Sequence, residues 1–454
     1  MPHTPLVPLQ RVKSSGLHAA QLVVTGFAAA VLIGTVLLLL PISKSGPGGA
    51  SFIEALFTAT SAVCVTGHII VDTPVYWSSF GQVVILALIQ VGGLGIMIFA
   101  SLIGITLARK MSIRGRVTAA AEARSVGMAD IAGMIRGIVV ITVVIEAAVF
   151  LALTLRFWLG YGYQLGDSVW YGLFHAVSAF NNAGFSTFSD NLVGFATDPW
   201  ICLPIALAII LGGLGFPVIM QLRKEFRRPL HWSMNTKLVL VGTGSLLAIG
   251  TALTCWIEWS NTATLGEMSP ADRILAGFFH TVQTRTAGFN SLPIGEMNSE
   301  TWFVSDILMF IGAGPAGTAG GIKVTTFLVL FFIMYTELRG EGAVNIFGKR
   351  LSRAVHRQAI TIVLASVAAV VVATGAIMLL TDFELDRVLF EVISAFATVG
   401  LSTGITADLP VPAQLILVAL MFLGRLGPLT LGTAIALKQR RTLYEFPKER
   451  PVIG

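Results

Sequence analysis

Four short stretches that end at a glycine hold the residues of this sequence best suited to bind an ion. In each stretch a phenylalanine lies ten residues before the glycine, and small or hydroxyl-bearing residues precede it: Phe57 to Gly67, Phe174 to Gly184, Phe278 to Gly288 and Phe390 to Gly400. Glycine reaches positive φ and lets the backbone approach an ion closely. A ring of backbone carbonyls can then replace the hydration shell of a monovalent cation. The residues directly before each glycine, SAVCVT, AFNNA, TRTA and FATV, contain no carboxylate, which argues against a divalent-cation filter.

The candidate ion-binding residues are the three at the end of each stretch. They are Val65, Thr66, Gly67, Asn182, Ala183, Gly184, Thr286, Ala287, Gly288, Thr398, Val399 and Gly400. A second glycine motif follows each stretch at a similar distance: Gly92-Gly-Leu-Gly, Gly212-Gly-Leu-Gly, Gly312-Ala-Gly-Pro and Gly424-Arg-Leu-Gly. Because both landmarks recur in the same order, the sequence predicts a fourfold internal repeat.

The composition places these motifs in a membrane. The chain has 454 residues, of which 55% are hydrophobic and only 12% are charged, and its mean hydropathy is +0.81. Charged residues make up about 25% of an ordinary soluble domain. The net charge of +6 does not indicate nucleic-acid binding, because the basic residues fall in short patches between apolar spans. The three cysteines are far apart and predict neither a disulfide framework nor a metal site.

Eight apolar stretches are long enough to cross a bilayer as helices. They are Ala19–Leu40, Phe80–Leu107, Ile131–Phe157, Trp200–Leu222, Leu238–Trp259, Trp302–Tyr335, Gln358–Leu380 and Ala413–Leu437. Four apolar segments of about a dozen residues lie between them and are too short to span. These are Phe52–Val63, Val169–Phe180, Arg273–Thr284 and Arg387–Ala397, and we expect each to be a re-entrant half-helix.

The basic residues predict the orientation. Five segments, namely the two ends of the chain and the loops at 108–130, 223–237 and 336–357, hold 22 of the 30 basic but only 7 of the 24 acidic residues. Lysine and arginine favour the cytoplasmic side, so both termini are expected there. The fold class is therefore an all-α integral membrane protein with eight transmembrane helices, in which four tandem span–pore half-helix–span repeats surround a pseudo-fourfold pore.

The expected organisation follows from these assignments. It consists of an N-terminal cytoplasmic segment 1–18, pore repeats at 19–107, 131–222, 238–335 and 358–437, cytoplasmic loops at 108–130, 223–237 and 336–357, and a cytoplasmic tail 438–454. In parallel repeats each half-helix directs the partial negative charge of its C-terminus toward the centre, which favours a cation there.

The sixth span is predicted to be broken. Its segment 312–321 contains five glycines and a proline, which cannot hold a regular helix. We expect an irregular loop below the filter that acts as a gate, although a passive kink would also fit. The candidate gating residues are Gly312, Gly314, Gly317, Gly320, Gly321, Lys323 and Arg425.

Charges within spans are functional candidates because burying them in the membrane is costly. We expect Arg425 to contact carbonyls of the 312–321 loop, with an ion pair to an acid as the alternative. Lys323 could equally snorkel to the membrane surface. Arg285 is interpreted as a donor to filter carbonyls or to an acid such as Glu391, and Glu146 as a hydrogen-bonded or protonated packing residue. Structural roles are expected for His68, His175 and His280.

The motifs TSAVCVTG, NNAGFS, RTAGFN and TVGLSTG, with GAGPAGTAGGIK and GRLGP, resemble the Trk/Ktr/HKT superfamily of potassium transporters. The resemblance extends from about Ala19 to the C-terminus and is greater to the membrane subunit of Ktr systems, because the chain lacks the two additional N-terminal spans of Trk-type chains. It implies that the filter glycines are Gly67, Gly184, Gly288 and Gly400. In plant relatives a serine at the first of these positions accompanies sodium selectivity, so glycine at all four implies a preference for potassium.

The resemblance also implies the setting of the protein. It implies potassium uptake across the plasma membrane, sodium as a possible activating ion, a homodimer in the lipid bilayer, and a cytoplasmic ring of nucleotide-binding regulatory subunits. The alternatives are a sodium-selective transporter or a cation-coupled secondary transporter of the same fold. An enzyme is not expected, because the sequence offers no nucleophile–base pair, clustered His/Asp/Glu set or phosphate loop.

Overall fold

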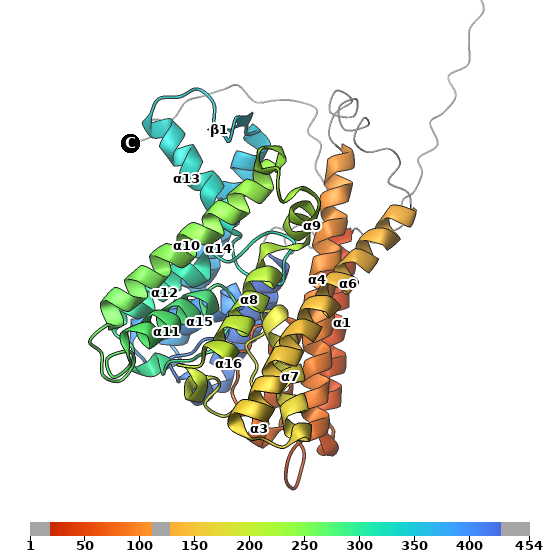
Figure 1. Cartoon of the computed structure of the whole chain (residues 1–454), viewed down its shortest axis with the longest axis vertical. Coiled ribbons are helices and arrows are strands. Elements are labelled where there is room, and N and C mark those ends of the chain that lie inside the picture. Colours follow the sequence, from red (N-terminus) through yellow and green to blue (C-terminus); the bar gives the residue numbers. More distant parts are fainter. Residues whose placement is uncertain (1–18, 111–127, 428–454) are drawn as a thin grey trace, which may run out of the picture.

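The computed structural model describes residues 19–110 and 128–427, which form helices joined by loops and one small hairpin (Figure 1). The expected N-terminal segment, most of the loop 108–130 and the C-terminal tail lie outside the described residues. The α-helices are α1 (Ala19–Leu39), α2 (Phe52–Val63), α3 (Thr73–Tyr76), α4 (Ser79–Lys110), α6 (Met128–Leu155), α7 (Leu165–Phe180), α8 (Pro199–Leu214), α9 (Phe216–Glu225), α10 (Met234–Glu258), α11 (Pro270–Gln283), α12 (Ser299–Phe310), α13 (Val324–Leu338), α14 (Arg353–Met378), α15 (Leu385–Ala397) and α16 (Val411–Leu426).

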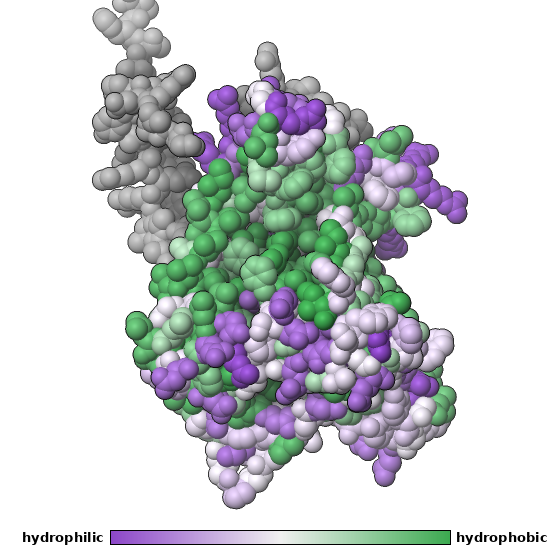
Figure 2. All heavy atoms as spheres, turned by 90° about the vertical axis from the view of Figure 1, so that its left-hand side faces the viewer, coloured by the Kyte–Doolittle hydropathy of each residue, from purple (hydrophilic) through white to green (hydrophobic). Residues whose placement is uncertain are grey.

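Five of these helices are long and apolar enough to cross a membrane, namely α1, α4, α6, α10 and α14. The bent pair α8 and α9 adds a sixth span if it is counted as one. Figure 2 shows an apolar band between two hydrophilic ends on one face of the molecule. The protein is therefore a membrane protein, as the sequence predicts.

The other two expected spans take different forms. Residues 302–335 are divided between α12 and α13, with the irregular segment 311–323 between them, where the glycines predict a break. The last span begins as α16 and is helical to Leu426, while the remainder of its expected length lies outside the described residues. Eight crossings and their direction stay predictions.

The inner span of the second repeat contradicts one expectation. We predicted a continuous helix over Trp200–Leu222, but α8 ends at Leu214 and α9 leaves at 98°. Gly215 lies at the bend with a φ of 88°, a value that favours glycine. The amide of Phe216 donates to the carbonyl of Ala316 instead of continuing the helix.

The four predicted half-helices are all present. The structure places them at α2, α7, α11 and α15, and each ends within one residue of the predicted position. Two of them begin with a serine cap: Ser51 and Glu54 form a reciprocal capping box on α2, and Ser269 accepts from the amide of Asp272 on α11. The capping side chains therefore satisfy free backbone amides at the N-termini of α2 and α11, although both helices are too short to span the membrane.

Each short helix packs on neighbouring helices of its own segment. Helix α2 packs on α1 and α4, α7 on α6 and α8, α11 on α10, and α15 on α14 and α16. Further contacts join successive segments: α4 with α7, α8 with α11, α12 with α15, and α16 back to α2. These contacts close a ring, so helices from both ends of the described chain lie side by side.

The remaining elements are short. They comprise η1 (Pro41–Ser43), η2 (Arg156–Gly160), η3 (Val193–Phe195), η4 (Pro229–His231), η5 (Ile294–Glu296), η6 (Thr406–Asp408), β1 (Asn345–Ile346) and β2 (Lys349–Arg350). The two strands pair antiparallel at the end of the molecule that also holds the C-terminal end of α13 (Figure 1).

Candidate ion-binding site

The four short helices end in turns with a shared backbone conformation. Two residues before each glycine lies a residue with positive φ: Val65 at 54°, Asn182 at 60°, Thr286 at 72° and Thr398 at 52°. Such a conformation is uncommon for any residue except glycine and strained for a β-branched one. The glycines themselves have φ values of 68° to 92°. We call residues 65–67, 182–184, 286–288 and 398–400 the four glycine turns.

Hydrogen bonds back to the helix fix three of these turns in the same way. The amides of Thr66, Ala183 and Val399 each donate to the carbonyl five residues earlier, at 2.7 to 2.8 Å. The third turn differs, because the amide of Ala287 donates to Gln283 at 3.0 Å and that of Gly288 donates to the same carbonyl at 3.4 Å. The strained conformation is therefore held by the helix end that precedes it.

The four glycine turns meet one another in chain order. A Cβ atom built on Gly67 would lie closer than 3.0 Å to the carbonyl oxygen of Ala183 in the second turn. The same holds for Gly184 toward the third turn and for Gly288 toward the fourth. Gly400 closes the ring, because its Cβ would collide with the carbonyl oxygen of Thr66. All four positions thus combine a positive φ with a backbone approach that excludes any side chain.

The second glycine motif brings the inner helices close to the turns. A Cβ on Gly92 would collide with the carbonyl oxygen of Val63, one on Gly212 with that of Phe180, and one on Gly424 with that of Phe396. Each of these carbonyls lies four residues before the glycine of its turn. The motif therefore has a packing function that its spacing alone does not reveal.

The segment 312–321 is an irregular loop packed beside these turns. The amides of Gly314 and Thr318 donate to carbonyls of Gly213 and Gly212, at 2.8 and 3.1 Å. The hydroxyl of Thr318 lies 3.1 Å from the side-chain oxygen of Asn182 in the second turn. On the other side, a Cβ on Gly320 would collide with the hydroxyl of Thr398 in the fourth turn. The loop therefore touches two of the four turns and the bend between α8 and α9.

Two cationic side chains face this loop, the buried Arg425 and the half-buried Lys323. Arg425 donates to the carbonyl oxygens of Thr318 and, at 3.1 Å, of Gly92. The expected contact with the loop is therefore present, and none of the ion pairs among the described residues includes Arg425. Lys323 donates to the carbonyls of Ala319 and Gly320 at 2.6 and 3.1 Å, so its ammonium is turned into the loop and does not snorkel.

A cavity of about 640 Å³ adjoins the loop. Its lining includes Lys323, Arg425, Gly317 and residues from α4, α9 and α16, but none of the four glycine turns. The positive charges of the two side chains thus lie where the loop meets this cavity.

The partners predicted for Arg285, filter carbonyls or an acid such as Glu391, are wrong. Its guanidinium donates to the carbonyls of Gly312 and Thr243, at 3.3 and 3.4 Å, and contacts neither a turn carbonyl nor Glu391. The break after α12 leaves the carbonyl of Gly312 without a helical partner, and Arg285 satisfies it. Glu146 is hydrogen-bonded, as expected: it accepts from Asn181, the residue that caps α7, at 3.1 Å.

Sequence reasoning missed Thr318 and the bend at Gly215. Thr318 joins the loop to the second turn and to Arg425, but a single threonine in a glycine-rich run gives no signal of this. The bend did have a signal, because Pro217 follows Gly215 by two residues and cannot supply an amide to a continuing helix.

The fold and these turns can now be compared with known proteins. Residues 17–443 match the family model of TrkH, described as a cation transport protein. The chain is 39% identical to Ktr system potassium uptake protein B of Bacillus subtilis, over 94% of this chain and 95% of that protein. It is 36% identical to the protein of the same name from Vibrio alginolyticus, over 96% and 94% of the two chains. It is also 34% identical to potassium/sodium uptake protein NtpJ of Enterococcus hirae, over 96% and 98%.

A solved structure shares the fold. The crystal structure of the potassium transporter TrkH from Vibrio parahaemolyticus superposes with a TM-score of 0.71 at 18% identity, covering 94% of this chain and 86% of that one. The protein is thus of the class of membrane cation transporters, and not an enzyme. The chain belongs to the TrkH family, as the resemblance of its motifs implied.

Proposed function

We propose that this protein takes up potassium through a pore whose selectivity filter is formed by the four glycine turns. The observation that carries the proposal is the closed ring of Gly67, Gly184, Gly288 and Gly400, which meet in chain order with no space for side chains. Four such turns at the ends of four half-helices provide backbone oxygens around a common axis. Carbonyl rings of this kind bind a dehydrated monovalent cation, and the potassium named in the relatives supports the choice of ion.

The proposed gate is the loop 312–321. It lies between the glycine turns and the cavity lined by Lys323 and Arg425, and hydrogen bonds hold it in that place. In this proposal ions pass when the loop withdraws. Two positive side chains at the loop slow cations further while it is in place.

The proposal includes the assembly that the relatives suggest. Two relatives are named as protein B of a Ktr system, which supports a separate partner subunit. We propose that the protein is a homodimer, with both termini in the cytoplasm, and that a ring of nucleotide-binding subunits on the cytoplasmic face moves the loop. Sodium is a possible activating ion, and the name of the Enterococcus hirae relative supports testing it.

Uptake in a potassium-auxotrophic host tests the function. We expect expression to restore growth at low potassium, with more uptake when a soluble nucleotide-binding partner is co-expressed, because the loop then opens. Potassium and sodium uptake are measured in the same cells, and antibody detection in membranes controls for expression. Sodium uptake that exceeds potassium uptake would favour the sodium-selective alternative. Proton-coupled uptake that saturates, without single-channel events in planar bilayers, would favour the coupled transporter.

A further inference from the structure

Glu391 forms hydrogen bonds with the irregular segment that follows the fourth glycine turn. It lies on α15, nine residues before Gly400, and its side chain is only 1% exposed. The carboxylate accepts from the hydroxyl of Ser402 at 2.7 Å, the amide of Thr403 at 2.8 Å and the hydroxyl of Thr406 at 2.8 Å. The half-helix is thereby joined to the chain on the other side of its own turn.

At the second turn a different residue of the half-helix, His175, makes the equivalent hydrogen bond to the segment after the turn. His175 lies on α7, nine residues before Gly184, and its Nε2 is 3.0 Å from the hydroxyl of Ser186. Ser186 and Ser402 each follow the glycine of their turn by two residues. In both turns, a buried polar residue at this helix position therefore forms a hydrogen bond with the segment that follows the glycine.

The first turn lacks such an anchor of its own. The equivalent helix residue is Thr58, whose buried hydroxyl has no hydrogen-bond partner, and the residue two after Gly67 is Ile69. Instead His68, which directly follows Gly67, places its Nε2 2.6 Å from a carboxylate oxygen of Glu391. Both side chains are 1% exposed.

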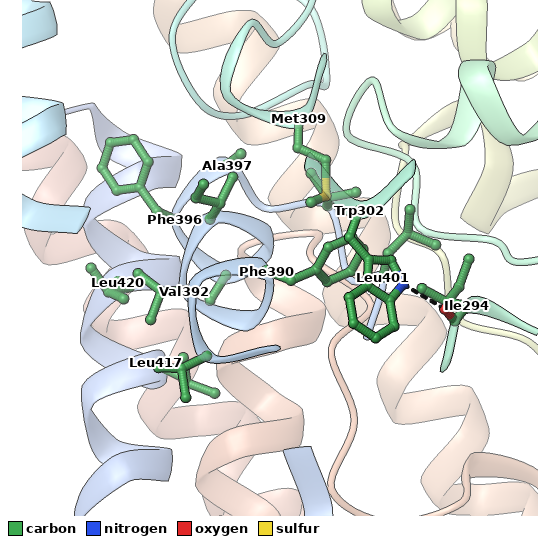
Figure 3. Close-up of a cluster of buried hydrophobic side chains, with 14 of the residues drawn as sticks. Ile294, Trp302, Met309, Phe390, Val392, Phe396, Ala397, Leu401, Leu417 and Leu420 are labelled. Carbon is green, nitrogen blue, oxygen red and sulfur yellow. Dashed lines mark hydrogen bonds between the residues drawn. The ribbon is translucent and has the colours of Figure 1, made fainter. Parts of the chain in front are cut away.

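Glu391 thus serves two turns that adjoin in the ring, because Gly400 is the glycine whose Cβ would meet Thr66. The backbone around Glu391 is held firmly: Phe390 and Val392 are fully buried on either side of it. In Figure 3 the side chain of Phe390 points toward Trp302 and Leu401, whereas that of Val392 points to the other side of α15, toward Leu417 and Leu420. Packing therefore fixes the position of the carboxylate. The carboxylate in turn fixes the segments that follow the first and fourth glycine turns.

We propose that Glu391 is a positioning residue for ion selectivity, which sets the separation of the first and fourth glycine turns through His68 and Ser402. The proposal rests on the assignment of the turns as the filter. A buried hydrogen-bonded acid with several donors is costly to disrupt, because each donor left behind loses its partner. Loss of the carboxylate should therefore relax two of the four turns at once, whereas loss of His175 should relax one.

The test compares Glu391→Gln, His68→Gln and the double variant in proteoliposomes, with potassium and sodium uptake measured separately. We expect Glu391→Gln to reduce the preference for potassium over sodium by about tenfold and His68→Gln to reduce it by a smaller factor, because His68 serves only the first turn. The double variant should be no worse than Glu391→Gln, because contacting residues are not additive. His175→Gln should give a smaller reduction. Glu54→Gln is the matched control, since within the described part of the chain the hydrogen bonds of that carboxylate go to Ser51 and Tyr76, at the other end of its helix from the turn.

The outcomes separate this proposal from the assignment of the filter. An unchanged preference in Glu391→Gln and His68→Gln, together with a lost preference in Gly67→Ser, would overturn the role of Glu391 and leave the filter in place. An unchanged preference for potassium in all three variants would overturn the assignment of the four glycine turns as the selectivity filter. If Glu391→Gln does not reach the membrane, His68→Gln and Thr406→Val decide the question. In any of them, an equal loss of uptake for both ions would indicate a structural role alone and contradict the proposal.

Discussion

Replacing Gly67 by serine is expected to reduce the preference for potassium over sodium by at least about tenfold, which corresponds to about 1.4 kcal/mol. Gly67 has a φ of 80°, and its Cβ would collide with the carbonyl of Ala183 in the neighbouring turn. The turn must shift to accept the side chain, so its carbonyls no longer match the other three. Potassium and sodium uptake into proteoliposomes, measured under the same gradient, gives the ratio.

The matched control is Gly46→Ser. Gly46 also has a positive φ, 85°, but no atom lies within 4 Å of the place that a Cβ would take there. This variant meets the same backbone strain, about 1–2 kcal/mol, without a collision. An equal loss of preference in both variants, or in neither, would contradict the assignment of Gly67 to the filter.

Removing residues 312–321 is expected to increase potassium uptake without the cytoplasmic partner by about tenfold, a change of about 1.4 kcal/mol. The loop is fixed by its amides on the bend between α8 and α9 and by Arg425 on the carbonyl of Thr318. Without it, the path between the glycine turns and the cavity at Lys323 loses its obstruction. Uptake at matched protein density in vesicles lacking the partner measures the effect.

A deletion of residues 46–48, in the loop that contains two glycines with open surroundings, is the control for shortening the chain. Arg425→Gln should also increase uptake, by a smaller factor, because it removes the charge and loosens the loop but leaves the loop in place. Uptake by the loop deletion at the level of the unmodified protein would exclude residues 312–321 from gating.

The sequence predicted the positions of the short helices well, because their ends carry local signals. The prediction for α2 matches its observed bounds, Phe52–Val63, and the break within 302–335 follows from its glycines and proline. Apolar length, capping residues and helix-breaking residues act within a few neighbours, so a sequence alone reveals them.

The same reasoning did not distinguish three similar Gly-x-Leu-Gly motifs. The helix α4 continues through Gly92–Gly95, whereas α8 ends before Gly215 and α16 ends before Gly427, both with positive φ. A proline shortly after the last glycine marks the two motifs that break. The bend at Gly215 is also stabilised by a bond to Ala316, a partner distant in sequence that no local pattern indicates.

The sequence singled out the four glycines that meet in the structure, but it did not reveal the contacts that support their turns. Positive φ at Val65 or Thr398 opposes the local preference of β-branched residues, so only the surrounding structure imposes it. The sequence predicted that Arg425 contacts the 312–321 loop, but not that it also donates to the carbonyl of Gly92 on α4. The partners of Arg285, the carbonyls of Gly312 and Thr243, could not be identified before those segments were placed.

The most direct test of the central claim is the location of a bound ion. Crystals or particles prepared in thallium, a heavy substitute for potassium, should give a peak on the axis between residues 65–67, 182–184, 286–288 and 398–400. The peak should fall when excess potassium is added and persist in excess sodium. A thallium peak at another place in the membrane region, with none among the four glycine turns, would contradict the account.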